Sequence, residues 1–220
     1  MAAHEVKRAD IRAYVGATGS GKGVGINAHL DAIKSRRFVA VDPLKEYGGR
    51  GVVVTTAGQV VAAMKKPTFS VIWQPSDDTD YDSKEFKADF ARVCKAVFLV
   101  GDLDFLVEEL ELFTRPTWAP AAWRNCTKRG RHQRLRIIAA TQRPADADKA
   151  FWSSCTYIRC HALRETEDGQ RMARVLKVPY EQIDSLKTIA VSATETRITY
   201  FEKDFSAGTC GEKTVTLRRR

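Results

Sequence analysis

Long apolar runs are missing from this sequence. No apolar stretch approaches the roughly 20 residues that a membrane-spanning helix needs. The N-terminus also carries no apolar core of the kind found in signal peptides. We therefore expect a soluble protein without a transmembrane segment, which acts in the compartment where it is made.

The sequence is equally poor in residues for a disulfide framework or a structural zinc site. Its five cysteines are odd in number and include no C-x-x-C pair, and its four histidines are scattered along the chain. This pattern favours reduced thiols in a cytosolic protein and argues against a structural metal ion.

Acidic residues are also in deficit. The chain has 36 Lys and Arg against 27 Asp and Glu, which gives a net charge of +9. The imbalance is sharpest between Arg115 and Arg143, where eight Lys or Arg residues stand without a single Asp or Glu. Such a surplus favours a polyanionic partner, although charge alone does not separate DNA from RNA or a membrane surface.

A glycine-rich stretch stands out from the rest of the chain. It reads Gly16-Ala17-Thr18-Gly19-Ser20-Gly21-Lys22-Gly23-Val24. Its Gly-x-x-x-x-Gly-Lys spacing is that of a phosphate-binding loop, and it lies between an expected strand at 11–15 and an expected helix from 26 to 33. Glycine lets successive backbone N–H groups surround the β- and γ-phosphates of a nucleotide, while Lys22 and the helix N-terminus add positive charge. We predict that residues 16–24 bind a nucleotide.

One position departs from the usual pattern of such loops. The Ser or Thr expected after the lysine, whose hydroxyl would bind Mg²⁺, is Gly23. The phosphate-binding motif is therefore strong, while its metal site is incomplete.

Apolar periodicity beyond this loop alternates between strand and helix. Expected strands lie at 38–41, 52–54, 69–73, 103–107, 135–140 and 155–161, and expected helices at 58–66, 86–98 and 167–186, the last broken at Pro179. This pattern predicts a single α/β domain over 1–220, with a mainly parallel sheet, helices on both of its faces and a C-terminal β-hairpin from 188 to 205. Residues 1–10 and 206–220 are expected to be flexible tails.

Two pairs of acidic residues could end the strand that carries a catalytic carboxylate. They are Asp102 with Asp104, and Glu108 with Glu109. Because the apolar stripe of the preceding helix ends just before Gly101, that glycine is the natural helix stop, and the strand follows it. Glu108 and Glu109 then stand at the C-terminal end of the strand, where ligands bind in parallel α/β sheets.

The motifs together resemble a known superfamily. The stretches concerned are Gly16 to Lys22, Val41-Asp42-Pro43 with Glu46-Tyr47, Phe105-Leu106-Val107-Glu108-Glu109, Arg129-Gly130-Arg131-His132 and Ala140-Thr141-Gln142-Arg143-Pro144. In this order they resemble the FtsK–HerA superfamily of ring translocases, and within it the genome-packaging ATPases of tailless, membrane-containing (tectivirus- and corticovirus-like) phages. The resemblance covers residues 11–145, about two-thirds of the chain, and implies a RecA-like P-loop NTPase fold.

This resemblance implies roles for four residues. Lys22 would bind the β- and γ-phosphates. Glu108 falls where the family usually has the Asp that holds Mg²⁺ through water, and Glu109 matches the glutamate that polarises the attacking water. Gln142 would sense the γ-phosphate and report its hydrolysis.

Four cations of the basic span are further candidates. Ring translocases hydrolyse ATP at subunit interfaces, where a neighbour's arginine neutralises developing charge, so Arg129 and Arg131 are candidates for that catalytic arginine. They could equally belong to a basic loop that faces DNA. Arg124 and Lys128 are predicted to contact DNA phosphates.

The implied function is an ATP-driven DNA translocase, which packages a double-stranded viral genome into a preformed capsid. ATP and Mg²⁺ would be its cofactors, and its partners would be DNA, further copies in a hexameric ring, and capsid or vertex proteins, in the host cytoplasm or the virion. Three alternatives stay open. They are a filamentous-phage assembly ATPase related to zonula occludens toxin, a phosphotransferase of the adenylate-kinase type, and a DNA-binding module with a degenerate nucleotide site.

Overall fold

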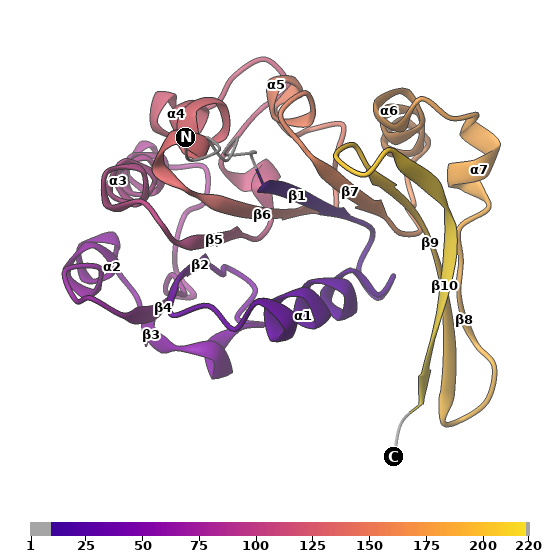
Figure 1. Cartoon of the computed structure of the whole chain (residues 1–220), viewed down its shortest axis with the longest axis horizontal. Coiled ribbons are helices and arrows are strands. Elements are labelled where there is room, and N and C mark those ends of the chain that lie inside the picture. Colours follow the sequence, from indigo (N-terminus) through magenta and orange to yellow (C-terminus); the bar gives the residue numbers. More distant parts are fainter. Residues whose placement is uncertain (1–9, 219–220) are drawn as a thin grey trace, which may run out of the picture. The chain divides into compact units, whose positions relative to one another are not determined.

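A computed structural model describes residues 10–218 of the chain (Figure 1). Most of the tail predicted at 1–10, and residues 219–220, therefore lie outside the described residues. The described residues form the predicted mixed α/β fold, and the sheet has ten strands. They divide into two compact units, which we describe separately. Unit 1 holds residues 10–11, 35–108 and 119–138, and unit 2 holds 12–34, 109–118 and 139–218. That the chain is one domain stays a prediction.

Unit 2 is built on strands β1 and β7, which pair in parallel. Its elements are β1 (Asp10–Val15), α1 (Lys22–Ile33), η2 (Leu110–Leu112), the end of β6 (Arg136–Thr141), α5 (Lys149–Trp152), β7 (Tyr157–Cys160), α6 (Thr166–Leu176), α7 (Tyr180–Asp184), β8 (Thr188–Ala190), β9 (Glu195–Asp204) and β10 (Thr209–Arg218). The strand order is β10-β9-β7-β1-β6, with β8 also paired to β9. Helix α1 lies on one side of these strands, and α5 and α6 lie on the other (Figure 1).

Unit 1 holds the remaining strands, with order β6-β5-β2-β4-β3. Its elements are β2 (Arg37–Val41), η1 (Gly48–Arg50), β3 (Val52–Val54), α2 (Ala57–Ala63), β4 (Phe69–Trp73), α3 (Lys84–Val100), β5 (Asp104–Val107), α4 (Ala121–Arg129), η3 (Gly130–Gln133) and the start of β6. Strand β2 is parallel to both β4 and β5, and β3 is parallel to β4. The continuous apolar runs of β2 and β5 are buried, as expected for central strands of a parallel sheet.

Helix α3 shows why the strand that follows it begins where it does. Ser83 caps the helix by accepting a hydrogen bond from the backbone N–H of Phe86, and the apolar stripe faces the core. Gly101 ends the helix with a φ of 59°, a left-handed conformation that glycine adopts readily. The predicted helix stop, and with it the predicted end of β5 at Val107, is confirmed.

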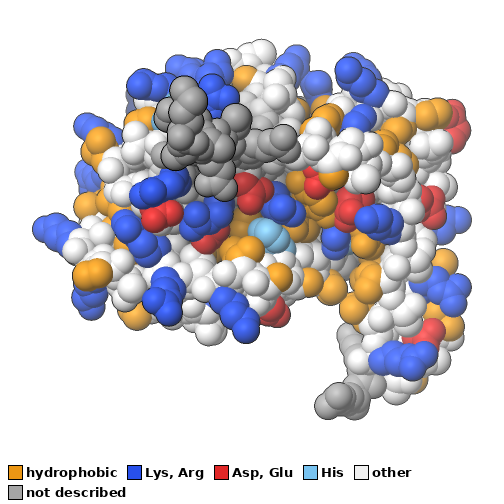
Figure 2. Space-filling view, viewed as in Figure 1, with side chains coloured by type: hydrophobic (Ala, Val, Ile, Leu, Met, Phe, Trp, Pro, Cys, Tyr) orange, Lys and Arg blue, Asp and Glu red, His pale blue; other side chains and the backbone are white. Residues whose placement is uncertain are grey.

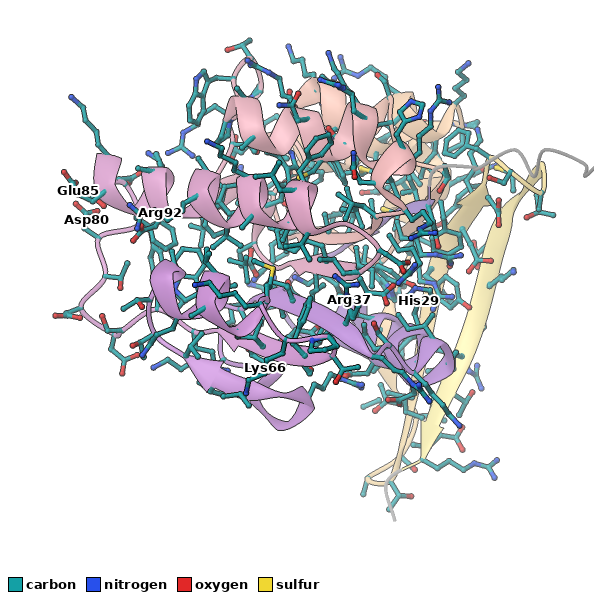
Figure 3. All side chains as sticks on the ribbon, turned by 60° about the vertical axis from the view of Figure 1, so that its left-hand side comes forward. His29, Arg37, Lys66, Asp80, Glu85 and Arg92 are labelled. Carbon is teal, nitrogen blue, oxygen red and sulfur yellow. The ribbon has the colours of Figure 1, made fainter. Side chains whose placement is uncertain are left out.

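Charged residues in α3 and in the loop before it lie at the surface of unit 1. Asp80, Glu85 and Arg92 are exposed and point outward (Figure 3).

Trp123 of α4 is fully buried, and its ring packs 5.9 Å from that of Phe90 on α3. The span that precedes β6 is thus anchored in the core through Trp123.

The C-terminal segment differs from the prediction in its extent. The expected hairpin ended at 205, with a flexible tail from 206, whereas β9 and β10 pair in antiparallel register from Glu195 with Arg218 to Asp204 with Thr209. The turn between them is stabilised because the Asp204 carboxylate accepts the N–H groups of Ser206 and Ala207. The tail expectation was therefore wrong for residues 209–218, while the C-terminal hairpin itself is confirmed.

No helix among residues 10–218 is long and apolar enough to cross a membrane. The predicted break of the helix over 167–186 is confirmed, because α6 ends at Leu176 and α7 begins after Pro179.

Candidate functional site

The glycine-rich loop connects β1 to α1, and its shape depends on glycine. Gly19 and Gly21 have φ values of 78° and 92°, which L side chains rarely adopt. A Cβ atom on Gly16 would lie 2.4 Å from Ser20 Oγ and 2.7 Å from His161 Cβ, so no larger residue fits there. Helix α1 begins at Lys22, and no side chain caps its N-terminus. The loop therefore presents an uncapped helix N-terminus, which attracts anions.

Neighbouring strand ends hold this loop in place. The Gly16 N–H donates to the Thr141 carbonyl at 3.2 Å, and the Ala17 N–H donates to the Ala162 carbonyl at 2.9 Å. From β8, the Thr188 hydroxyl donates to the Ser20 carbonyl at 3.0 Å. Ser20 Oγ itself is buried and has no hydrogen-bond partner. A buried donor without an acceptor is unusual, and its position in this loop fits a site that takes an anion such as a nucleotide phosphate.

Three predicted site residues meet beside the loop. Lys22 Nζ lies 3.5 Å from Glu109 Oε1, and the same oxygen accepts a hydrogen bond of 2.6 Å from Gln142 Nε2. Both Lys22 and Glu109 are buried, with 7% and 6% of their surface exposed. The structure thus brings together a lysine from the start of α1 with a carboxylate and an amide that follow the ends of β5 and β6.

The loop residue Thr18 joins this cluster. Its hydroxyl donates to Gln142 Oε1 at 2.5 Å. The Gln142 amide therefore links the glycine-rich loop to Glu109 through its two ends. The hydrogen bonds of this amide thus connect the end of β6 to both the glycine-rich loop and the turn after β5.

Glu109 has an unusual backbone. It follows β5 and precedes η2 with φ 49° and ψ 56°, a left-handed conformation. Non-glycine residues in this region are strained, and such strain is often found at functional sites. The contacts with Lys22 and Gln142 fix the carboxylate of this strained residue in one place.

Glu111 belongs to the same cluster and was missed by the sequence analysis. Its Oε1 accepts the backbone N–H groups of Gln142 and Arg143, at 3.0 and 3.1 Å. Burial and the neighbouring charge of Glu109 raise the pKa of Glu111 to about 8. The available signal was a third carboxylate two residues after Glu109, but no pattern in the sequence joins it to a strand end 31 residues later.

Glu108 lies in unit 1 and is fully buried. Its Oε1 accepts a hydrogen bond of 2.8 Å from the Tyr47 hydroxyl, and burial, together with the charge of Glu108, raises the pKa of Tyr47. The Asp42 carboxylate in turn accepts the backbone N–H groups of Glu46 and Tyr47. The motif around Asp42 and Tyr47 therefore fixes the orientation of Glu108.

The protein side chains alone do not make a metal site in the part of the chain that the structure describes. No group of three or more His, Cys, Asp or Glu residues there could hold a metal ion. Gly23 adds no hydroxyl ligand either. Any Mg²⁺ bound with a nucleotide would need ligands from the phosphates and water, which is common for this ion.

Apart from Arg115, whose guanidinium donates to the backbone carbonyls of Glu111 and Thr114, the cations of the basic span form two groups. Arg134, Arg136 and Arg143 pair with acidic residues outside the span, namely Asp102, Asp104, Asp146 and Asp168. The expectation of eight uncompensated charges was therefore too broad. The basic span also contains two tryptophans. Trp118 is 46% exposed, so only Trp123 is a core residue.

The other group is the set of predicted DNA and interface residues in unit 1. Arg124, Lys128, Arg129 and Arg131 are all exposed, and none of them pairs with an acidic side chain among residues 10–218. The Arg129 guanidinium lies 5.8 Å from the centre of the Phe98 ring. Figure 2 shows Lys and Arg side chains spread over the visible face of unit 1 and along its edge.

Comparison with known proteins connects this arrangement to viruses. No protein-family model matches the chain. It is 28% identical to Protein P9 of Pseudoalteromonas phage PM2 over 213 residues, which cover 93% of this chain and 89% of that protein.

Solved structures of viral packaging enzymes are similar in fold. The genome packaging NTPase B204 of Sulfolobus turreted icosahedral virus 2, in complex with ATP-γS, matches with a TM-score of 0.67 and 18% identity, over 93% of this chain and 96% of that one. B204, the DNA-packaging ATPase of Sulfolobus turreted icosahedral virus, matches with a TM-score of 0.66 and 17% identity, over 94% and 97%. The chain therefore has the α/β fold of these NTPases, and the predicted resemblance to viral packaging ATPases is confirmed at the level of the fold.

Proposed function

We propose that the protein is an ATPase that drives the packaging of a viral genome. The observation that carries this proposal is the meeting of Lys22 and Gln142 on the Glu109 carboxylate, next to a glycine loop at a helix N-terminus. The similarity to packaging NTPases that bind ATP analogues supports it.

The cluster of unit 2 can bind and hydrolyse a nucleoside triphosphate. The loop N–H groups and the N-terminus of α1 would hold the phosphates. Lys22 would pair with the β- and γ-phosphates, and because the γ-phosphate and Glu109 are both anions, they would compete for it. Glu109 would then accept a proton from the attacking water. Gln142, which bridges Glu109 and Thr18, would respond to loss of the γ-phosphate.

Mg²⁺ would be held by phosphate oxygens and water, with Glu108 as the candidate carboxylate. Tyr47 fixes one oxygen of Glu108, so the carboxylate is already oriented before a metal binds. When bound, the ion would neutralise phosphate charge as it does in related phosphoryl-transfer enzymes.

Coupling to DNA would use the exposed cations of unit 1. Arg124 and Lys128 lie one helical turn apart on α4 and would contact phosphates of double-stranded DNA without regard to sequence. Arg129 and Arg131 are candidates to act in the active site of a neighbouring copy in a hexameric ring. Capsid or vertex proteins would be further partners, during virion assembly in the host cytoplasm or at the virion.

Two variants test the nucleotide chemistry. Lys22→Ala should abolish ATP binding, because the lysine contributes to ground-state affinity, while Glu109→Gln should keep ATP binding and lose turnover. Binding of a fluorescent ATP analogue and release of phosphate measure the two effects. Normal turnover by the Glu109→Gln protein would refute the proposed base.

A further inference from the structure

Glu111 has no role in the function proposed above, yet it contacts the backbone of Gln142 directly. It lies in η2, the short helical turn that follows Glu109. One oxygen, Oε1, accepts two consecutive backbone N–H groups, those of Gln142 and Arg143. A carboxyl oxygen that receives two main-chain donors fixes the position of the chain segment that carries them.

The bonded segment is the point where β6 ends. The last residue of β6 is Thr141, and the N–H groups of the next two residues leave the strand. These N–H groups have no partner in the strand ladder, and Glu111 accepts from both, while the Thr141 hydroxyl also accepts from the Arg143 N–H at 3.1 Å. The direction in which the Gln142 side chain leaves the strand is therefore set partly by Glu111.

Gln142 is consequently held through both its backbone and its side chain. Its backbone is bound to Glu111, and its side chain is bound to Glu109 and Thr18. Glu109 and Glu111 come from the same turn, so one short segment fixes both the main chain and the amide of Gln142. A shift of the Gln142 backbone would move its amide away from Glu109, and small displacements of positioning groups reduce catalytic rates strongly.

We propose that Glu111 is a positioning residue for hydrolysis, which fixes the backbone of Gln142 so that the Gln142 amide stays on Glu109 and follows the γ-phosphate. This inference rests on the proposed ATPase function. It assigns a task to a third carboxylate, beyond the pair at the end of β5.

Two substitutions of Glu111 separate its hydrogen bonds from its volume. Glu111→Gln keeps the Oε1 acceptor and a similar size, whereas Glu111→Leu keeps most of the volume and removes the acceptor. We expect Glu111→Leu to lower kcat by about 10- to 100-fold. KM and the affinity for a fluorescent ATP analogue should change less than about threefold, because a positioning residue acts on the chemical step rather than on ground-state binding. Glu111→Gln should stay within about threefold of the wild-type kcat, and the exposed Glu181→Leu on α7 is the matched control, with no change.

A double-mutant cycle with Gln142 tests the route of action. If Glu111 acts through the Gln142 side chain, Glu111→Leu in a Gln142→Ala background should lower kcat by less than about threefold further, since the group it positions is gone. A purely structural role would instead give additive losses of kcat, or a loss of ATP binding in parallel with kcat.

The outcomes separate this inference from the function on which it rests. Wild-type protein without ATP turnover would overturn both. If the wild type turns over ATP, three results would overturn the positioning role alone. They are a Glu111→Leu variant as active as the wild type, additive losses of kcat in the double-mutant cycle, and a Glu111→Gln variant as impaired as Glu111→Leu. The positioning role would be established if turnover falls in Glu111→Leu and is retained in Glu111→Gln, and if Glu111→Leu has little further effect in the Gln142→Ala background.

Discussion

The strand ends of unit 2 and the outer face of α4 in unit 1 hold their charges in opposite ways. In unit 2, Lys22 and Glu109 are buried and contact each other, so their charges are balanced within the chain. On α4, Arg124 and Lys128 are exposed and have no acidic partner in the described part of the chain. Under the proposed function, the first region would perform chemistry with its own residues, whereas the second would need an anionic partner to balance its charge.

The largest expected effect concerns Glu109 of the buried pair in unit 2. Glu109→Gln should lower ATP turnover by about 10²- to 10⁴-fold, the range of a general base, while the affinity for a fluorescent ATP analogue stays near that of the wild type. The exposed Glu181→Gln is the matched control and should leave turnover unchanged. Loss of binding in parallel with turnover would show that Glu109 supports the loop rather than the water.

The next largest effect concerns the exposed cations of α4. Replacing both Arg124 and Lys128 with Ala should weaken binding to all double-stranded DNA sequences alike and reduce the slope of log affinity against log salt by about 1.8, or about 0.9 per lost phosphate contact. ATP turnover without DNA should persist. Fluorescence anisotropy at several salt concentrations measures the slope, and an unchanged slope would remove α4 from the DNA interface.

Arg129 and Arg131 decide whether α4 serves DNA or a neighbouring active site. If they act in a neighbour's site, either Ala variant should lose turnover and keep DNA affinity, and wild-type subunits mixed in should restore part of the activity. If they contact DNA, affinity should fall and turnover without DNA should stay. Unchanged turnover and affinity in both variants would contradict both roles.

A smaller effect concerns Glu108, the buried acid of unit 1. Tyr47→Phe removes the hydrogen bond to Glu108, and leaving a buried acceptor with one bond fewer costs about 1–3 kcal/mol. Urea unfolding should show this loss of stability. Tyr81→Phe is the control, because the Tyr81 ring packs on Phe86 and its hydroxyl has no hydrogen bond in the described structure, so its effect should stay within about 0.5 kcal/mol. Equal stabilities of the two variants would contradict the role of Tyr47.

The last effect is a pH dependence of stability in unit 2. The native protein keeps a proton on Glu111 up to a pKa of about 8, whereas the unfolded chain releases it near the ordinary value of 4.5. The native state therefore binds more protons between these values, and the free energy of unfolding falls as pH rises, by at most about 1.4 kcal/mol per pH unit.

His161 has the opposite effect at lower pH. Burial lowers its pKa from 6.5 to about 4, so the free energy of unfolding gains from rising pH between these values. The contribution of Glu111 is therefore clearest between pH 6.5 and 8. There, Glu111→Gln should unfold with a flatter pH dependence than the wild type in urea, and identical slopes would contradict the raised pKa of Glu111.

Much of the fold and site could be predicted because local signals and global packing agree. Gly101 ends α3 as its sequence suggests, which places Glu109 at the end of β5. The glycine spacing fixes the loop, and the apolar run before Gln142 places it at the end of β6. These residues meet because parallel strands carry their functional side chains at the same end.

The parts that could not be predicted depend on contacts between distant segments. Glu111 bonds to backbone N–H groups, which have no signature in the sequence. Strand β10, TCGEKTVTLR, has few apolar residues, and its structure comes from ten-residue pairing with β9 rather than from its own apolar pattern. The pairing of Arg136 with Asp104 likewise depends on the neighbouring positions of β5 and the start of β6 in the sheet, because the two residues are 32 positions apart in the sequence.

The most direct test of a DNA-packaging ATPase is the rate of ATP hydrolysis by the wild-type protein, with and without double-stranded DNA. We predict measurable turnover without DNA, a several-fold increase with DNA that falls as salt is raised, and for Glu109→Gln a turnover lowered by about 10²- to 10⁴-fold in both conditions. A rate that ignores DNA, or phosphate transfer to a nucleoside monophosphate in place of hydrolysis, would contradict the proposed function.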